Sequence, residues 1–376
     1  MKRVAFSMIA AAGLMLGLTS SAPAIPLNEG KPIDVVLCLD VSGSMQGLID
    51  SAKTRLWDIV NELARVKPAP QLRVALYSYG HSTYPAKDGW VRKEVDLTTD
   101  LDEIYRKLNA LTINGGEEYV ARVSHAALVE QKWNDEKNAL KLVFVCGNEP
   151  AHQDPSIKLE VVSDLAKKKG VVVNTIYCQW GHSEELKGWQ EFALACKGKF
   201  AVIEHNQRVV QVQTPYDKDL LALNEKLNKT FIGYGRLGED KAKNQLAQDA
   251  NAEKAGAQAA ASRIATKGGA LYKNSDWCIV SRFMEDPKFD ITKVPEAELP
   301  EELRKMKPAE RVEFVKKKKE ERERINKDIN DVSVKRQKFI DEELKKNASA
   351  SDKALDTALR KMLREQAKEK GIEIPE

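Results

Sequence analysis

The stretch that decides the fold is Ile33–Gly47, with the sequence IDVVLCLDVSGSMQG. Its first half is apolar and rich in β-branched side chains, which is typical of a strand buried on both faces of a sheet. The strand leads directly into Asp40, Ser42 and Ser44, and apolar residues then recur at helical spacing. A carboxylate and two hydroxyls therefore stand on the turn between a core strand and an amphipathic helix. In open α/β sheets, ligands bind at such turns.

The side chains of this turn offer only oxygen atoms, the ligand type that hard cations such as Mg²⁺ prefer. Another interpretation is that Ser42 or Ser44 is simply the N-cap of the helix that follows. The two interpretations are compatible, and the sequence favours a metal site that also caps the helix.

The pattern Asp-x-Ser-x-Ser, between a buried strand and an amphipathic helix, resembles the metal-ion-dependent adhesion site of the von Willebrand factor type A (VWA) domain. The resemblance implies a Rossmann-like α/β fold with a doubly wound, mostly parallel sheet. Strand and helix patterns alternate from residue 32 to about 207, as this fold requires. The charged, alternating run Trp90–Leu97 is the expected antiparallel edge strand.

The resemblance also implies that two further loops reach the metal. The loop Thr112–Glu118 places Glu117 directly after a glycine pair, where the family usually has a threonine. The loop Cys146–Pro150 places Asn148 where the family usually has an aspartate, although another alignment would put Cys146 there. The implied ligands of Mg²⁺, or of another divalent cation such as Mn²⁺ or Ca²⁺, are Asp40, Ser42, Ser44, Glu117 and Asn148. A degenerate site, in which Glu117 only begins a helix, is the alternative.

The first residues have the pattern of a signal peptide. Lys2 and Arg3 precede the mostly apolar run Val4–Leu18, and small residues at 22–24 suit cleavage. We therefore expect residues 1–24 to be removed on export, and the mature protein to be periplasmic or secreted. No later run is apolar enough to predict a membrane span.

The chain continues well beyond the predicted domain of residues 32–207. We expect a helix-rich extension packed on that domain at 208–285, a connector at 286–307 and a charged helical tail at 308–376. The alanine-rich run Asp240–Thr266 is strongly helix-prone. Heptad spacing of Ile325, Val332 and Phe339 is too brief for a long coiled coil. This later part resembles, more loosely, exported bacterial VWA proteins with charged helical tails.

Several classes of function lack support. The 376-residue chain has a net charge of +4 from nearly balanced acids and bases, which gives no reason to expect nucleic acid as a partner. Its cysteines form no C-x-x-C pair, and neither a nucleophile elbow nor a Walker loop occurs. Aromatic and histidine side chains could rim the metal face: His81, Tyr84, His152, Trp180, His182 and Trp189.

The sequence therefore favours an exported binding protein rather than an enzyme, with a protein or a surface polymer as its partner. An acidic partner residue is the ligand that the family resemblance implies, but a carboxylate at Glu117 would weaken the pull of the ion on it. The second hypothesis is a metal-poor scaffold whose C-terminal helices make the contacts. A metal-dependent hydrolase ranks last.

Overall fold

The computed structural model describes residues 30–179, 185–204, 212–347 and 361–374. Within them, one six-stranded sheet has the strand order β3-β2-β1-β4-β5-β6. All neighbouring strands are parallel except β2 and β3, which pair antiparallel at one edge. The predicted fold class is therefore confirmed. The strands are β1 (Pro32–Asp40), β2 (Gln71–Tyr79), β3 (Val91–Thr98), β4 (Leu140–Gly147), β5 (Val172–Gln179) and β6 (Phe200–Glu204).

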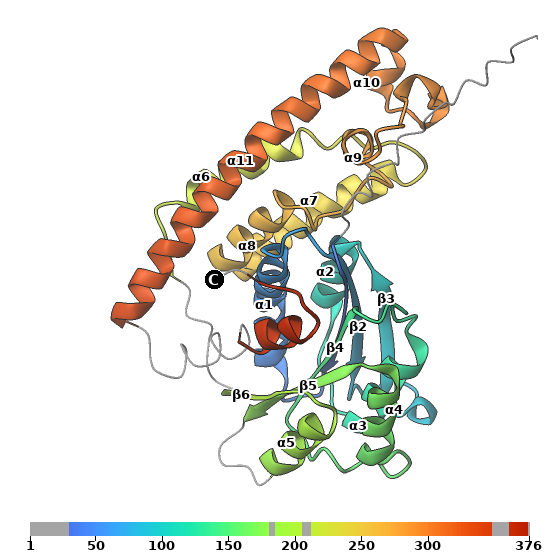
Figure 1. Ribbon diagram of the computed structural model, residues 1–376, viewed down its shortest axis with the longest axis vertical. Coiled ribbons are helices and arrows are strands. Elements are labelled where there is room, and N and C mark those ends of the chain that lie inside the picture. Colours follow the sequence, from blue (N-terminus) through green and yellow to red (C-terminus); the bar gives the residue numbers. More distant parts are fainter. Residues whose placement is uncertain (1–29, 180–184, 205–211, 348–360, 375–376) are drawn as a thin grey trace, which may run out of the picture.

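Helices cover both faces of the sheet (Figure 1). Because side chains alternate along a strand, Ile33, Val35 and Leu37 of the fully buried β1 enter one core, while Val36 and Cys38 enter the other. The first core is covered by α1 (Gln46–Ala64) and α2 (Leu101–Ala110), and the second by α3 (Val120–Glu130), α4 (Leu159–Lys169) and α5 (Leu186–Ala195). A short 3₁₀ turn, Ala86–Asp88, precedes β3.

A helical arm follows the sheet domain and lies across the α1 and α2 side of it (Figure 1). The expected helix over residues 240–266 is two helices, α7 (Gly238–Ala255) and α8 (Ala257–Lys267). They are divided at Gly256, whose φ of 120° and ψ of 171° do not fit a helix. The arm comprises α6 (Asp217–Asn228), α7 (Gly238–Ala255), α8 (Ala257–Lys267), α9 (Ile279–Glu285), α10 (Glu301–Arg304) and α11 (Pro308–Asn347), with 3₁₀ turns at Ile291–Lys293 and Glu296–Glu298.

A buried charged cluster joins the arm to α2. The Arg263 side chain, only 1% exposed, donates to Asp102 of α2 at 2.6 Å and to Asp249 of α7 at 2.7 Å. Lys267 donates to the same Asp249 at 2.7 Å, and the Tyr272 hydroxyl donates to Asp102. Since each of these charges has a partner, the contact fixes α7 and α8 on the sheet domain.

The last described segment, residues 361–374, returns to the sheet domain and packs beside α1 (Figure 1). Leu363, Ala367 and Ile372 are buried in the same core as Ile33. The amides of Gln366 and Asn174 in β5 donate to each other's oxygen at 2.7 and 3.1 Å. The segment 361–374 is thus part of the sheet domain.

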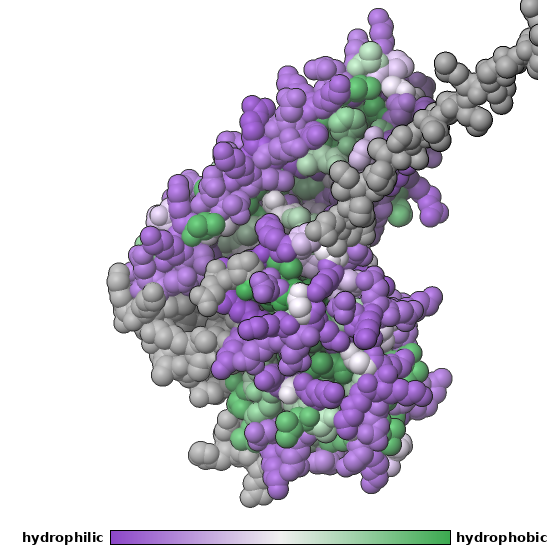
Figure 2. Space-filling model, in the orientation of Figure 1, coloured by the Kyte–Doolittle hydropathy of each residue, from purple (hydrophilic) through white to green (hydrophobic). Residues whose placement is uncertain are grey.

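The outward surface of α11 is hydrophilic (Figure 2). Its apolar residues Ile325 and Ile329 turn inward and pack with Leu220 and Leu227 of α6 and with α8. Of the predicted heptad residues, Ile325 and Val332 belong to this cluster, and Phe339 contacts Tyr216. Among the helices that the structure describes, none combines the length and the apolar composition needed to cross a membrane.

Candidate functional site

Asp40, the last residue of β1, lies completely buried at the carboxyl end of the central strand. Its Oδ1 accepts a hydrogen bond from the Ser42 amide at 2.8 Å, while its Oδ2 has no hydrogen-bond partner. The backbone amide of Asn114 donates to the Val41 carbonyl at 3.0 Å. This bond holds the loop that carries Glu117 and Glu118 against the turn after β1.

The loop after β4 meets Asp40 from the other side, since β1 and β4 are paired. A Cβ on Gly147 would lie 3.0 Å from Asp40 Oδ2 and 2.4 Å from the Tyr79 hydroxyl, so only glycine fits there. The next residue, Asn148, donates from Nδ2 to Ser44 Oγ at 3.2 Å, and its buried Oδ1 has no partner. The structure therefore brings Asp40, Ser42, Ser44 and Asn148 together.

The carboxylate that comes from the loop before α3 belongs to Glu118. A Cβ on Gly80 would lie 2.8 Å from Glu118 Cγ, 3.1 Å from Asp40 Oδ1 and 3.6 Å from Ser42 Cβ. Glu117, the residue predicted from the sequence, is exposed. Helix α3 begins only at Val120 and not at Glu117, so the preceding chain is not helical. Of the two glutamates, Glu118 is therefore the one whose side chain lies beside Asp40.

The acidic side chains of the site raise one another's pKa. Burial raises the pKa of Asp40 to about 7, and the negative charges of Glu118 and Glu149 add to this effect. Burial likewise raises the pKa of Glu118 to about 7, with further contributions from Glu149 and Glu117. The Ser42 hydroxyl is close enough to both carboxyls to lower the pKa of each, without forming a hydrogen bond of ordinary geometry.

Three buried oxygen atoms of the predicted ligand residues lack hydrogen-bond partners: Asp40 Oδ2, Ser42 Oγ and Asn148 Oδ1. A buried polar atom without a partner is destabilising by about 1–3 kcal/mol and calls for an explanation, such as an ion. The donor set consists of oxygen alone, so it fits a hard divalent cation. In the part of the chain that the structure describes, no three His, Cys, Asp or Glu residues form a metal-binding group. The fit therefore depends on the hydroxyl and amide oxygens.

The N-cap interpretation of the serines is not observed. Helix α1 begins at Gln46 with Met45 as its N-cap residue, and no side chain caps it. Ser42 and Ser44 stand in the turn before the cap, one with a free oxygen and the other bonded to Asn148. Helix capping therefore does not explain why hydroxyls occupy these positions.

The predicted rim residues have other partners. His81 is buried, stacks on Tyr84 with ring centroids 4.9 Å apart, and approaches Thr112 Oγ1 at 3.4 Å. Trp189 is buried in the core and donates to the Glu149 carbonyl at 2.8 Å. Exposed His152 lies beside Gly188, whereas Trp180 and His182 lie outside the described residues. The five cysteines are free and buried.

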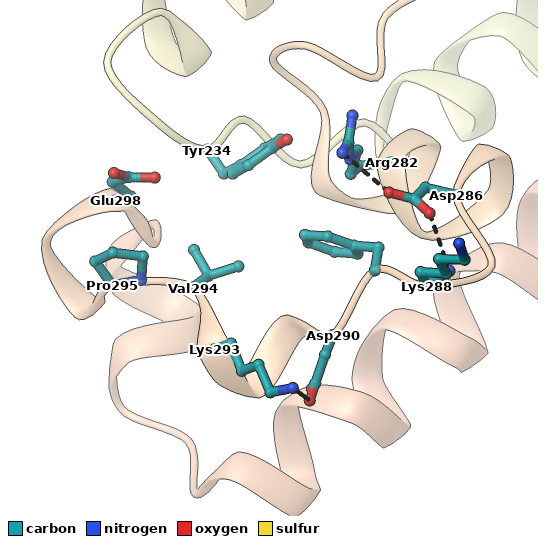
Figure 3. Close-up of a pocket in the computed structure, with 10 residues that line it drawn as sticks. Tyr234, Arg282, Asp286, Lys288, Asp290, Lys293, Val294, Pro295 and Glu298 are labelled. Carbon is teal, nitrogen blue, oxygen red and sulfur yellow. Dashed lines mark hydrogen bonds and ion pairs between the residues drawn. The ribbon is translucent and has the colours of Figure 1, made fainter.

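A depression of about 400 Å³ lies on the helical arm between α9 and the turns that follow it (Figure 3). Its charged rim is largely self-compensated, since Arg282 pairs with Asp286 at 3.0 Å and Lys293 with Asp290 at 3.6 Å. We therefore regard the turn after β1, with its unpartnered oxygens, as the functional site.

Comparisons with known proteins give one family match and several similar solved structures. The family model of the von Willebrand factor type A domain matches residues 34–214. A solved structure of proximal thread matrix protein 1 from the mussel byssus, with a zinc-occupied MIDAS motif, is 16% identical with a TM-score of 0.37, covering 47% of this chain and 43% of that one. The SpRpn10 VWA domain is 16% identical with a TM-score of 0.37, covering 47% of this chain and 90% of that one.

A third solved structure, a von Willebrand factor type A protein from Catenulispora acidiphila, is 16% identical with a TM-score of 0.37, covering 46% of this chain and 39% of that one. The match thus spans less than half the length of both the mussel and the Catenulispora chains. No curated protein matches the sequence.

Proposed function

Residues 34–214 form a von Willebrand factor type A domain, and from this premise we propose that the protein is an exported binding protein whose partner docks at a divalent-cation site. VWA domains commonly mediate binding to other proteins. The observation that carries the proposal is the set of buried oxygens without partners on Asp40, Ser42 and Asn148.

In this proposal, Asp40, Ser42, Ser44, Asn148 and Glu118 hold the ion, which is Mg²⁺ or a similar divalent cation. When bound, the ion supplies a positive charge and a position for an oxygen atom of the partner. The amide of Ser42 orients the Asp40 carboxylate through Oδ1, and Asn148 Nδ2 orients the Ser44 hydroxyl. These two hydrogen bonds arrange the donor atoms before the ion arrives.

We propose that the protein binds its partner without catalysis and acts outside the cytoplasm. The sequence supports export through the charged start and apolar run of residues 1–24, which lie outside the described residues. It supports a binding role because it lacks the sequence motifs of a nucleophile elbow and a nucleotide loop.

The test is the thermal response to metal. We expect millimolar Mg²⁺ added after EDTA treatment to raise the Tm of the wild-type protein, because a ligand bound only by the folded state stabilises it by about 2.7 kcal/mol at 100 times its Kd. Asp40→Asn removes a charged ligand at nearly constant volume and should abolish the rise. Asp164→Asn, on the exposed side of α4, is the matched control and should respond as the wild type does. A Mg²⁺ response that persists in Asp40→Asn would remove Asp40 from the site.

The alternative function is a metal-poor scaffold whose C-terminal helices contact the partner. The raised pKa of Asp40 favours it, since a protonated carboxyl can remain buried without an ion. A wild-type protein whose Tm responds to none of Mg²⁺, Mn²⁺ or Ca²⁺ would select this alternative.

A further inference from the structure

The proposed site carries more negative charge than a divalent cation can neutralise. Asp40 and Glu118 lie beside Ser42. The negative charge of Glu149, in the loop after β4, acts on both carboxyls, and that of Glu117 acts on Glu118. We infer that this site selects a protein segment that presents an arginine or lysine, and that it rejects an acidic one. The inference rests on the proposed function for the location of the site.

These carboxyls come from loops that meet at one place, since Glu118 approaches Asp40 and Asn148, the neighbour of Glu149, bonds to Ser44. Beyond the effect of burial, Glu118 and Glu149 each raise the pKa of Asp40, and Glu149 and Glu117 each raise that of Glu118. Two arginines on adjacent elements already have carboxylate partners: Arg92 lies 2.5 Å from Glu94, and Arg122 lies 2.9 Å from Asp154. Their charges are therefore already engaged.

An acidic cluster alone would not make a binding site, but this one surrounds atoms that need a ligand. Asp40 is 0% exposed and Ser42 is 3% exposed, yet Asp40 Oδ2 and Ser42 Oγ have no hydrogen-bond partners. Both belong to the turn that the Glu118 carboxyl approaches. The unpartnered atoms point to an ion, and the surrounding glutamates determine the charge that remains once an ion is bound.

Four carboxylates around an ion of charge +2 leave a net negative charge when all are ionised. A partner carboxylate would meet like charge, which disfavours binding, whereas a guanidinium or ammonium group would be attracted. The partner's contact to the ion itself would then be a neutral oxygen, such as a carbonyl or a hydroxyl. This preference is opposite to the one that the family resemblance implies.

The surface beside the site is open at two glycines. Gly43 and Gly115 are both exposed, and nothing lies within 4 Å of a Cβ placed on Gly115. The nearest atom to a Cβ on Gly43 is the Gly115 amide, at 3.9 Å. A partner backbone can therefore approach this pair of glycines closely, while exposed Glu117 is available to its side chain.

The test uses two synthetic peptides, acetyl-Ser-Gly-Arg-Gly-Ser-amide and its counterpart with Glu in place of Arg. Each is titrated into the full-length ¹⁵N-labelled protein in Mg²⁺ at low ionic strength, and the amide resonances of Gly43 and Gly115 are followed. We expect the arginine peptide to shift these resonances and to bind at least tenfold more tightly than the glutamate peptide. The double variant Glu117→Gln/Glu149→Gln should reduce that preference to less than threefold. Glu160→Gln, an exposed acid on α4, is the control and should keep it.

A glutamate peptide that binds as tightly as the arginine peptide would overturn the inference. So would an arginine peptide that leaves the two glycine resonances unmoved, or one that binds the double variant unchanged. Repeating the titrations in EDTA separates the two proposals. Failure of the metal site alone removes the Mg²⁺-dependent rise in Tm but leaves a preference for arginine, which Glu117 and Glu149 maintain without the ion.

Discussion

Burial keeps Asp40 from ionising freely near neutral pH, because its pKa in the folded protein is raised to about 7. When folding raises the pKa of a carboxyl, the folded state loses stability relative to the unfolded state as the pH rises and the carboxyl ionises. The same holds for Glu118, whose pKa is also raised to about 7. Without metal, these residues therefore oppose folding as the pH rises, and a bound cation would remove that effect.

This opposition predicts the pH dependence of the metal-free protein. In EDTA, we expect the free energy of unfolding to fall as the pH rises from 5 to 8, by about 2–3 kcal/mol from Asp40 alone. The unfolded chain has already lost this proton near pH 4, whereas the folded chain loses it only near pH 7, so the loss of stability falls between these values. Urea denaturation at several pH values measures it. Asp40→Asn should flatten the profile, and an equally steep profile in that variant would contradict the assignment.

A pair of neighbouring variants distinguishes the two glutamates. Glu118→Gln should reduce the Mg²⁺-dependent rise in Tm by at least half, since its carboxyl approaches Asp40 and Ser42. Glu117→Gln should leave most of the rise intact, because Glu117 is exposed. Thermal melts in matched EDTA and Mg²⁺ buffers provide the measurement. The reverse ranking would place Glu117 at the ion, as the sequence pattern alone suggests.

The sequence was sufficient to bring Asp40, Ser42 and Ser44 into one hypothesis, because they follow a recognisable core strand, and the family resemblance added Asn148. It was not sufficient for Glu118. Two consecutive glutamates follow the glycine pair, and the choice depends on where the next helix begins. That start, at Val120, is set by tertiary packing, and no capping residue marks it in the sequence.

At the scale of elements, the succession of strand and helix patterns predicted the sheet, because buried parallel strands are near-continuous apolar runs. The division of residues 240–266 into α7 and α8 was missed. Alanine-rich sequence on both sides of Gly256 favours helix, and the break becomes evident only where α8 packs against α1.

The contact between the arm and α2 depends on Arg263. We expect Arg263→Ala to destabilise the protein by about 3–5 kcal/mol, because it leaves the buried Asp102 and Asp249 carboxylates short of a partner. Arg282→Ala removes an exposed pair with Asp286 and should change stability by less than about 1 kcal/mol. Chemical denaturation of both variants compares them directly. Equal effects would mean that the buried cluster does not hold the arm on the domain.

At the scale of the whole molecule, the first domain is completed by the last helix. The sequence predicted a helix near the C-terminus from the spacing of its apolar residues, including Leu363. It could not predict where that helix packs, because the Gln366–Asn174 contact joins residues 192 positions apart. Such long-range contacts leave no local pattern.

Removal of residues 348–376 tests this arrangement. The truncated protein should lose several degrees of Tm, since it exposes the apolar surface that Leu363, Ala367 and Ile372 cover. Leu363→Ala in the full-length chain should cost about 2–5 kcal/mol. A synthetic peptide of residues 348–376, added to the truncated protein, should restore part of the Tm. A truncated protein as stable as the full chain would show that the segment is dispensable.

The return of residues 361–374 to the core beside β1 also affects the order of events during biosynthesis. Until residues 361–374 have left the ribosome, the domain begun at residue 32 remains open on one side, with an apolar strip uncovered. It can close only once that segment is free to pack beside β1. A polypeptide that stays incompletely packed for so long is a suitable client for chaperones that hold unfolded chains.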